Sequence, residues 1–140
     1  ERLYDFNMTS HRPMTLVLSK ERTEEGLKEA LFARRTLIYF YDTLMGKEDL
    51  LDKFYKASIQ IHPVHYTTEE RRYVEIENTS DVPFRLHKTD KSATGFPDKI
   101  EIPAGKTILV ILPKSDKSGI DYEVGNLIIT SDKRLAVKLF

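Results

Sequence analysis

The chain has 140 residues, enough for one ordinary hydrophobic core or for two small units that share an interface. Its 22 basic and 22 acidic side chains balance, ten of each before Ala57 and twelve of each after it, so neither part carries the positive charge typical of nucleic-acid or anionic-lipid binding. Cysteine is absent, which excludes thiol catalysis and disulfides, and no apolar run approaches the roughly 20 residues of a membrane-spanning helix, so we expect a soluble chain that does not insert into a membrane.

The first part of the chain predicts a β-α-β-α segment. Met14 to Leu18 is a short apolar run suited to a buried strand, and Thr23 offers an N-cap hydroxyl to a helix that ends by about Arg35. The β-branched and aromatic run from Thr36 to Tyr41 predicts a second buried strand, which we expect to return parallel to the first. A second helix is predicted from about Lys47 to Lys56, with its leucines on one side and its charges on the other.

From Ala57 onward the apolar period changes to two, which is typical of strands. The strands around Val74 and Phe84 flank a turn and predict a hairpin-like pair, and the stretch from Lys99 to Leu112 repeats this pattern. A last pair is predicted at residues 126–130 and 135–140. About seven short strands separated by turns indicate an immunoglobulin-like antiparallel β-sandwich. We therefore expect an α+β chain with an α/β segment at residues 1–56 packed on a sandwich at residues 57–140.

Residue types that carry chemistry give few signals. His62 and His65 are three residues apart and would lie on opposite faces of a regular strand, which does not suit a shared metal ion. The motif "PAGKT" at Pro103 lacks the longer glycine-rich run of a phosphate-binding loop and precedes a strand, so it predicts a β-turn. The "NTS" triplet at Asn78 fits a glycosylation acceptor, although its place in a turn also explains it. The sequence thus predicts no catalytic residue and no metal ligand within the chain.

One basic cluster is a candidate phosphate site. The "SHRP" motif, which contains His11 and Arg12, precedes the first predicted strand, and Arg22, Arg34 and Arg35 come from the nearby loop and helix end. Guanidinium and imidazole groups are suited to binding phosphate or carboxylate. Arg34 and Arg35 also fit the negative end of the helix dipole. We take His11, Arg12 and Arg35 as candidate contacts for a substrate phosphate.

The stretch "HRPMTLVLSKERTEEGLKEALFARRTLIYF", residues 11–40, resembles the end of the catalytic domain of the PHP (polymerase and histidinol phosphatase) family of phosphoesterases. The resemblance extends over roughly Asn7 to Phe54, about a third of the chain, and rests on "EAL" at Glu29 and on Arg35 and Thr36 after the helix. Arg34 replaces the glycine that usually precedes this Arg-Thr pair, so we expect the helix to end without a left-handed glycine cap. Exported phosphodiesterases of this family add a C-terminal β domain, which fits the remainder of the chain.

The resemblance implies a parent protein that is a metal-dependent hydrolase of phosphodiesters or phosphomonoesters. Its His, Asp and Glu ligands for Mn, Zn or Fe would lie upstream of Glu1, in a catalytic domain that is the expected partner of this chain. We therefore expect the chain itself to be a non-catalytic, cofactor-free C-terminal part of a longer protein. The same resemblance implies an exported or periplasmic parent.

A second hypothesis is a free-standing immunoglobulin-like module that binds a glycan or a protein. Its contacts would come from the loops at Asp90 to Pro97 and Lys114 to Tyr122, since such folds place function in loops. The apolar face of residues 15–41 distinguishes the two hypotheses. A partly uncovered face, or one shared in a homodimer, indicates a missing larger partner, whereas full burial favours the free module.

Overall fold

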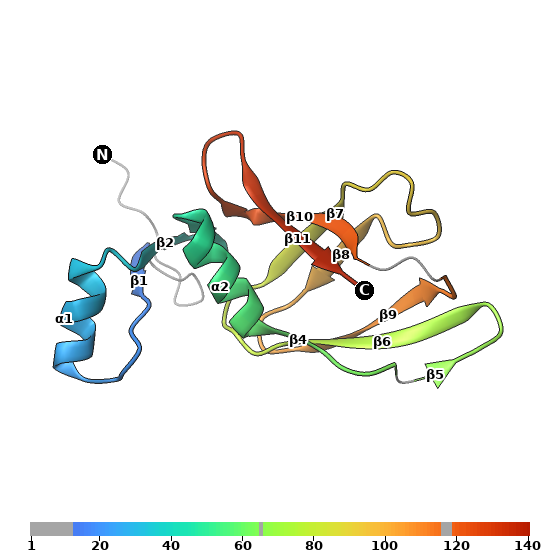
Figure 1. The fold of residues 1–140 in the computed structure, drawn as a ribbon, viewed down its shortest axis with the longest axis horizontal. Helices are drawn as coiled ribbons and strands as arrows, with labels where there is room; N and C mark the ends of the chain where they lie inside the picture. The colour runs from blue at the N-terminus through green and yellow to red at the C-terminus, as the bar shows by residue number, and fades with distance from the viewer. Residues whose placement is uncertain (1–12, 65, 116–118) are drawn as a thin grey trace, which may run out of the picture.

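A computed structural model describes residues 13–64, 66–115 and 119–140 of the chain. Figure 1 shows a two-layer β-sandwich and, extending away from it, an arm that consists of residues 13–45 with α1 at its far end. The elements are, in chain order, β1 (Met14–Val17), α1 (Glu24–Phe32), β2 (Thr36–Phe40), β3 (Thr43–Met45), α2 (Glu48–Ser58), β4 (Ile59–Ile61), β5 (Tyr66–Thr67), β6 (Arg71–Asn78), β7 (Phe84–Lys88), β8 (Lys99–Ile102), β9 (Thr107–Pro113), β10 (Ile120–Ile128) and β11 (Arg134–Leu139).

The strands form two sheets. The first has the order β1-β2-β3-β10-β7-β8, with β11 also paired to β10, and the second consists of β4, β5 and β9 around β6. Alternate side chains of both sheets meet in one core, in which the largest fully buried members include Tyr122, Phe84 and Ile76. This arrangement confirms the predicted α+β fold with an antiparallel sandwich. The described part of the sandwich has eight strands from β4 to β11, of which β5 has two residues, against the predicted seven or so.

The predicted parallel return of the second strand is wrong, because β1 and β2 pair antiparallel. After Val17 the chain continues away from the strand, and α1 then brings it back over the same distance, so Thr36 begins β2 directly opposite Val17. A backbone bond from Leu18 to the carbonyl of Arg35, 2.9 Å, extends this ladder. In a parallel crossover the helix would have to return along the full length of β1. Helix α1 instead lies beyond the ends of β1 and β2.

Strand β3 was not expected from the sequence. Tyr41 and Asp42 join it to β2 as a two-residue turn in which both have positive φ, 46° and 58°. Such turns favour Asn-Gly or Asp-Gly, and neither pair is present here. The side chain of Asp42 accepts a hydrogen bond from the Tyr39 hydroxyl at 2.8 Å, which helps to hold this unusual turn.

The two predicted hairpin-like pairs are also wrong, because their turns connect the two sheets. Strand β6 pairs with β9, and β7 pairs with β8. The buried side chain of Asn78 joins the two connections, since its amide donates to the carbonyls of Val82 at 2.8 Å and Pro103 at 3.1 Å. Its oxygen accepts from the backbone of Ser80. The "NTS" triplet is therefore explained by a structural role of its asparagine.

The last predicted pair, β10 and β11, is confirmed as an antiparallel pair. Strand β10 begins at Ile120, which places Ile120 to Tyr122 in the sheet and not in a loop. The other edge of β10 pairs first with β7 and then, in parallel, with β3 through Leu127 and Ile128. The arm and the sandwich therefore share one sheet. Helix α2 contacts β2, β4 and β11.

Helices of the described ranges are short: α1 has nine residues and α2 eleven. Neither has the length and apolar character that a membrane span requires.

Candidate functional site

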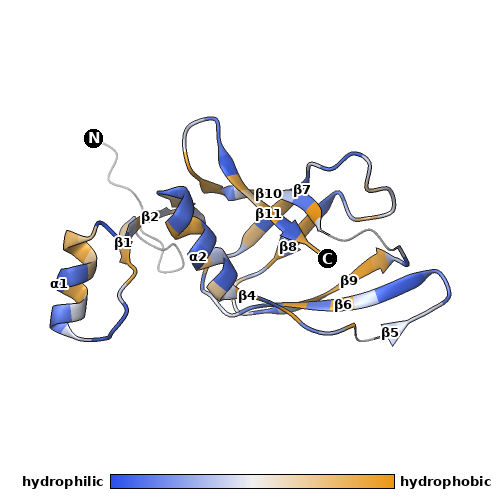
Figure 2. Ribbon diagram, in the orientation of Figure 1, coloured by the Kyte–Doolittle hydropathy of each residue, from blue (hydrophilic) through white to orange (hydrophobic). Residues whose placement is uncertain are grey.

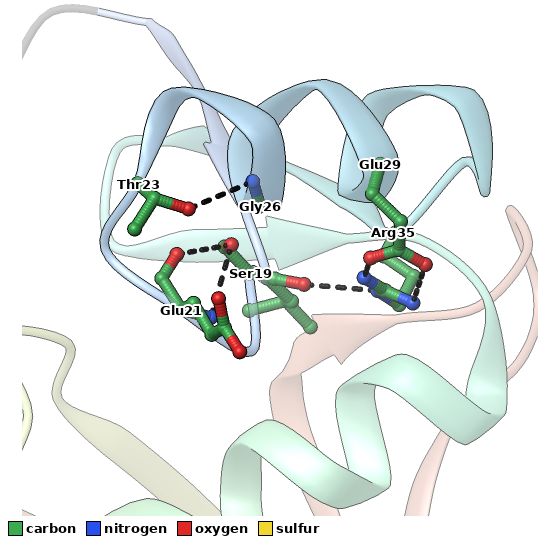
Figure 3. A network of polar contacts seen from close by, with 7 residues as sticks. Ser19, Glu21, Thr23, Gly26, Glu29 and Arg35 are labelled. Atoms are coloured by element: carbon green, nitrogen blue, oxygen red, sulfur yellow. Dashed lines mark hydrogen bonds and ion pairs between the residues drawn. The ribbon is translucent and has the colours of Figure 1, made fainter.

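Arg35 is the one predicted phosphate contact that lies within the described residues, because His11 and Arg12 fall outside them. Its guanidinium donates two hydrogen bonds to the carboxylate of Glu29, one of them at 2.9 Å, and a third to the carbonyl of Leu18 at 3.1 Å (Figure 3). This pairing lowers the pKa of the Glu29 carboxyl, chiefly through the hydrogen bonds from Arg35. Arg35 therefore ties the end of α1 to the end of β1, and its role as a phosphate contact stays a prediction.

Arg34 follows the end of α1 and has a left-handed backbone conformation, with φ of 54°. The sequence did not predict this conformation, because the position lacks glycine. The N–H of Arg34 bonds to the carbonyl of Leu31 at 3.0 Å, and that of Arg35 bonds to the carbonyl of Ala30 at 2.9 Å. These two bonds form the Schellman arrangement that usually has glycine at this position. At the other end of the helix the Thr23 hydroxyl caps Gly26 at 3.0 Å, as predicted (Figure 3).

His62 has a partner other than a metal ion. Its imidazole lies 2.9 Å from the carboxylate of Glu77 on the neighbouring strand, and both side chains are partly exposed. His65 falls outside the described residues. Within those residues no three His, Asp or Glu side chains come together as a metal-binding group.

The loop from Asp90 to Pro97 is anchored to the sandwich. The ammonium group of Lys88 donates to the carbonyls of Ala93 and Phe96, both at 2.9 Å, and pairs with Asp98 at 2.8 Å. Ala93 and Phe96 are buried in the core. Two residues of the loop therefore serve packing. In the second candidate loop, residues 116–118 fall outside the described residues and the end belongs to β10.

The arm presents a large uncovered apolar surface. The spacing of Leu27, Ala30 and Leu31 predicts one apolar helix face, yet Ala30 alone of α1 is buried. Phe32 is 88% exposed, and on β2 Ile38 is 54% exposed, on the strand face opposite the buried Leu37 and Tyr39. Figure 2 shows hydrophobic colouring on α1, which lies apart from the sandwich. We define the arm surface as Leu27, Leu31, Phe32, Ile38, Phe40 and Tyr41, all of which are exposed.

A cavity of about 360 Å³ lies where the arm meets the sandwich. Met14, Leu16 and Tyr39 of the arm form one wall, and Phe54 of α2 and the turn that contains Asp81 form the other. The lining is largely apolar, and no three possible metal ligands come together among the described residues. The cavity therefore belongs to the junction between the arm and the sandwich.

The chain is similar to a known protein family and to a solved structure. Residues 59–140 match the Ig-like domain family DUF5001. No curated protein matches the chain. The chain is similar to the crystal structure of a two-domain protein containing a predicted PHP-like metal-dependent phosphoesterase from Bacteroides vulgatus ATCC 8482, with 33% sequence identity and a TM-score of 0.81. The similarity covers 97% of this chain and 40% of that chain, so the present chain spans less than half the length of that protein.

Proposed function

The chain belongs to the Ig-like domain family DUF5001, and we propose that it is the C-terminal, non-catalytic accessory region of a larger metal-dependent phosphoesterase. The similarity to the two-domain protein supports this proposal, since it includes nearly all of this chain but only 40% of that one. Hydrolysis of phosphodiesters or phosphomonoesters would then be performed by a PHP-like domain outside the chain. Residues 1–56 would end that domain and residues 57–140 would form the Ig-like domain.

The uncovered arm surface is the observation that carries the proposal. Phe32 is 88% exposed and would gain roughly 1.5–3 kcal/mol from full burial, and Ile38, which is 54% exposed, would gain about half as much. Large apolar side chains that are exposed together on one segment indicate an interface. A free-standing binding module would be expected to bury this face in its own core. We therefore assign the arm surface to contact with the catalytic domain.

The metal ions would be held by that other domain. Mn, Zn or Fe would supply an activated water for phosphoester hydrolysis. The described residues do not fit such a cluster, because they bring no three possible ligands together. No catalytic step is therefore assigned to this chain. The contribution of His11, Arg12 and Arg35 to phosphate binding, and export of the parent protein, remain proposals from resemblance.

A binding experiment tests the accessory role. The domain encoded immediately upstream of Glu1 would be expressed separately and titrated against the 140-residue chain by calorimetry. We expect binding that Phe32→Lys and Ile38→Lys each weaken by about tenfold or more, because an ammonium group would be buried without a partner. Ile61→Lys is the matched control, since Ile61 is 44% exposed on β4 of the sandwich and should leave the affinity unchanged.

Two further results would contradict the proposal. The first is an upstream coding region without the His-x-His motif and acidic ligands of PHP enzymes. The second is hydrolysis of a phosphodiester by the 140-residue chain alone when Mn²⁺ or Zn²⁺ is added, because we expect turnover only when the upstream domain is present.

A further inference from the structure

Strand β9 is an open edge of the sandwich. It pairs with β6 on one side, and no other described strand pairs with it. The bonds from Asn78 to the carbonyl of Lys106 and from Lys114 to the carbonyl of Glu70, both 2.9 Å, fix the alternation of the ladder. Even-numbered residues of β9 therefore bond to β6, and the backbone groups of Thr107, Leu109 and Ile111 point outward from the edge.

Apart from Pro113 at its end, this edge lacks the usual protection against strand pairing. Residues 107–113 carry no charge, and Leu109 and Ile111 are 54% and 45% exposed on the outer face. Figure 2 shows hydrophobic colouring on β9. By contrast, the edge strand β8 of the other sheet places Lys99 and Glu101 in exposed positions. Native edge strands are normally blocked by such charges or kept short, so a seven-residue uncharged edge is suited to pairing with a further strand.

We propose that this edge pairs with β9 of a second copy of the chain, antiparallel and across a two-fold axis at Leu109. In this register Leu109 faces Leu109 of the other copy and Thr107 faces its Ile111. All outward-pointing backbone groups of these residues are then paired, in about six hydrogen bonds. The two four-stranded sheets would join into one continuous sheet.

Charge and proline at the strand ends disfavour the registers one and two residues later. An axis one residue later, at Val110, would place Lys106 opposite Lys114 of the other copy, and facing like charges are destabilising. An axis at Ile111 would place Leu109 opposite Pro113, which has no N–H to donate. The axis at Leu109 instead sets Lys106 against Leu112 and Lys114 against Ala104. In this register no like charges face each other, so β9 can pair with β9 of a second copy.

A groove beside the strand provides room for the inner side chains of the second copy. It has a volume of about 300 Å³ and lies between β8 and β9, with Lys99, Ile100 and Glu101 on one side and residues 108–111 on the other. In the proposed pairing Ile108 of one copy lies opposite Val110 of the other, on the inner face next to this groove. The contact thus continues the apolar core of each sandwich across the edge.

Sedimentation of the 140-residue chain over a concentration series tests the pairing. We expect the wild type to approach twice its 16.3 kDa mass. Leu109→Lys and Leu109→Glu should each remain at 16.3 kDa, because two like charges then face each other at the axis. An equimolar mixture of these two variants should recover the doubled mass, since opposite charges then meet.

Further variants separate the edge from general effects. Leu109→Pro should also give a monomer, because it removes an N–H that points out of the edge and leaves the ladder to β6 intact. Ile61→Lys introduces the same charge at a similarly exposed position on β4 and should not change the mass. Circular dichroism would check that each variant is folded. A wild-type chain at 16.3 kDa at every concentration, or folded Leu109 variants that still double in mass, would overturn the proposal.

Discussion

The side-chain amide of Asn126 donates a hydrogen bond to the backbone carbonyl of Asp42 at 2.6 Å, across 84 positions of the sequence. The same amide donates to the carbonyl of Pro83 at 2.6 Å, and its oxygen accepts from the N–H of Arg85 at 3.1 Å. Asn126 lies where β10 leaves β7 and joins β3, so one buried side chain satisfies backbone groups at the end of the arm and at the start of β7.

Replacement of this residue should destabilise the whole protein. Asn126→Ala removes one acceptor and two donor contacts from a site that is 4% exposed, so we expect a loss of about 2–4 kcal/mol in the free energy of unfolding. Urea denaturation measures this change. Lys91→Ala, at an exposed position, should stay within about 0.5 kcal/mol of the wild type. A loss at Asn126 no larger than that of the control would contradict its role.

The end of helix α1 should be improved by glycine. Arg34 is exposed and holds a φ of 54°, so Arg34→Gly should stabilise the chain by about 0.5–1 kcal/mol through relief of this conformation. Lys28→Gly, in the middle of the same helix, should instead destabilise it by about 1 kcal/mol. Thermal unfolding followed by circular dichroism compares the two. Equal effects of both glycines would show that the helix end is not strained.

Loss of the hydroxyl group should have different effects on the stability of the protein at two buried tyrosines. The Tyr55 hydroxyl is buried and has no hydrogen-bond partner among the described residues, and burial raises its pKa. Tyr55→Phe should therefore be neutral or stabilise the chain by about 1 kcal/mol. The Tyr122 hydroxyl donates to the carbonyl of Pro97 at 2.9 Å, so Tyr122→Phe should cost about 1–2 kcal/mol. Urea denaturation of both variants gives the comparison, and a large loss at Tyr55 would reveal a missed partner.

The Lys88 and Asp98 pair predicts a change in stability with pH. The hydrogen bond and the charge of Lys88 lower the pKa of Asp98 below its usual 3.8. Because the pKa is lower in the folded state, the pair contributes stability above pH 3.8, and this contribution is lost as the pH falls through the lower folded value. Asp98→Asn should thus be less stable than the wild type at neutral pH.

The difference between Asp98→Asn and the wild type should close at acid pH. Urea unfolding midpoints of both proteins, measured between neutral pH and about pH 2, would show whether their stabilities converge. A difference that keeps its size over the whole range would mean that the carboxylate charge of Asp98 does not contribute.

Alternating hydrophobicity predicted the sandwich but not the pairing of its strands. Turn residues such as those of "NTSDVP" serve equally in a hairpin and in a connection between sheets. The choice depends on the buried amide of Asn78, which bonds to Pro103, a residue 25 positions away. A contact of this kind leaves no periodic signal in the sequence.

The arm shows a second limit of sequence patterns. Leu27 and Leu31 have the spacing of an apolar helix face, but spacing does not indicate whether another element covers that face. Tyr41 and Asp42 adopt positive φ, but the Asn-Gly or Asp-Gly pair that usually indicates such a turn is absent. The sequence therefore did not predict the three residues of β3. Of the predicted phosphate contacts, Arg35 alone lies among the described residues, and its guanidinium pairs with Glu29, six positions earlier in the sequence.

The pairing of β3 with β10 has a mechanical consequence. Because Leu44 and Met45 are bonded to the central strand of the sandwich, the arm cannot swing as a domain on a hinge without breaking a sheet. In the proposed parent enzyme the catalytic domain and the sandwich would therefore move as one rigid body. A protein cut before residue 59, where the family match begins, would in turn lose the strand that protects the end of β10 and expose Leu127 and Ile128 to aggregation.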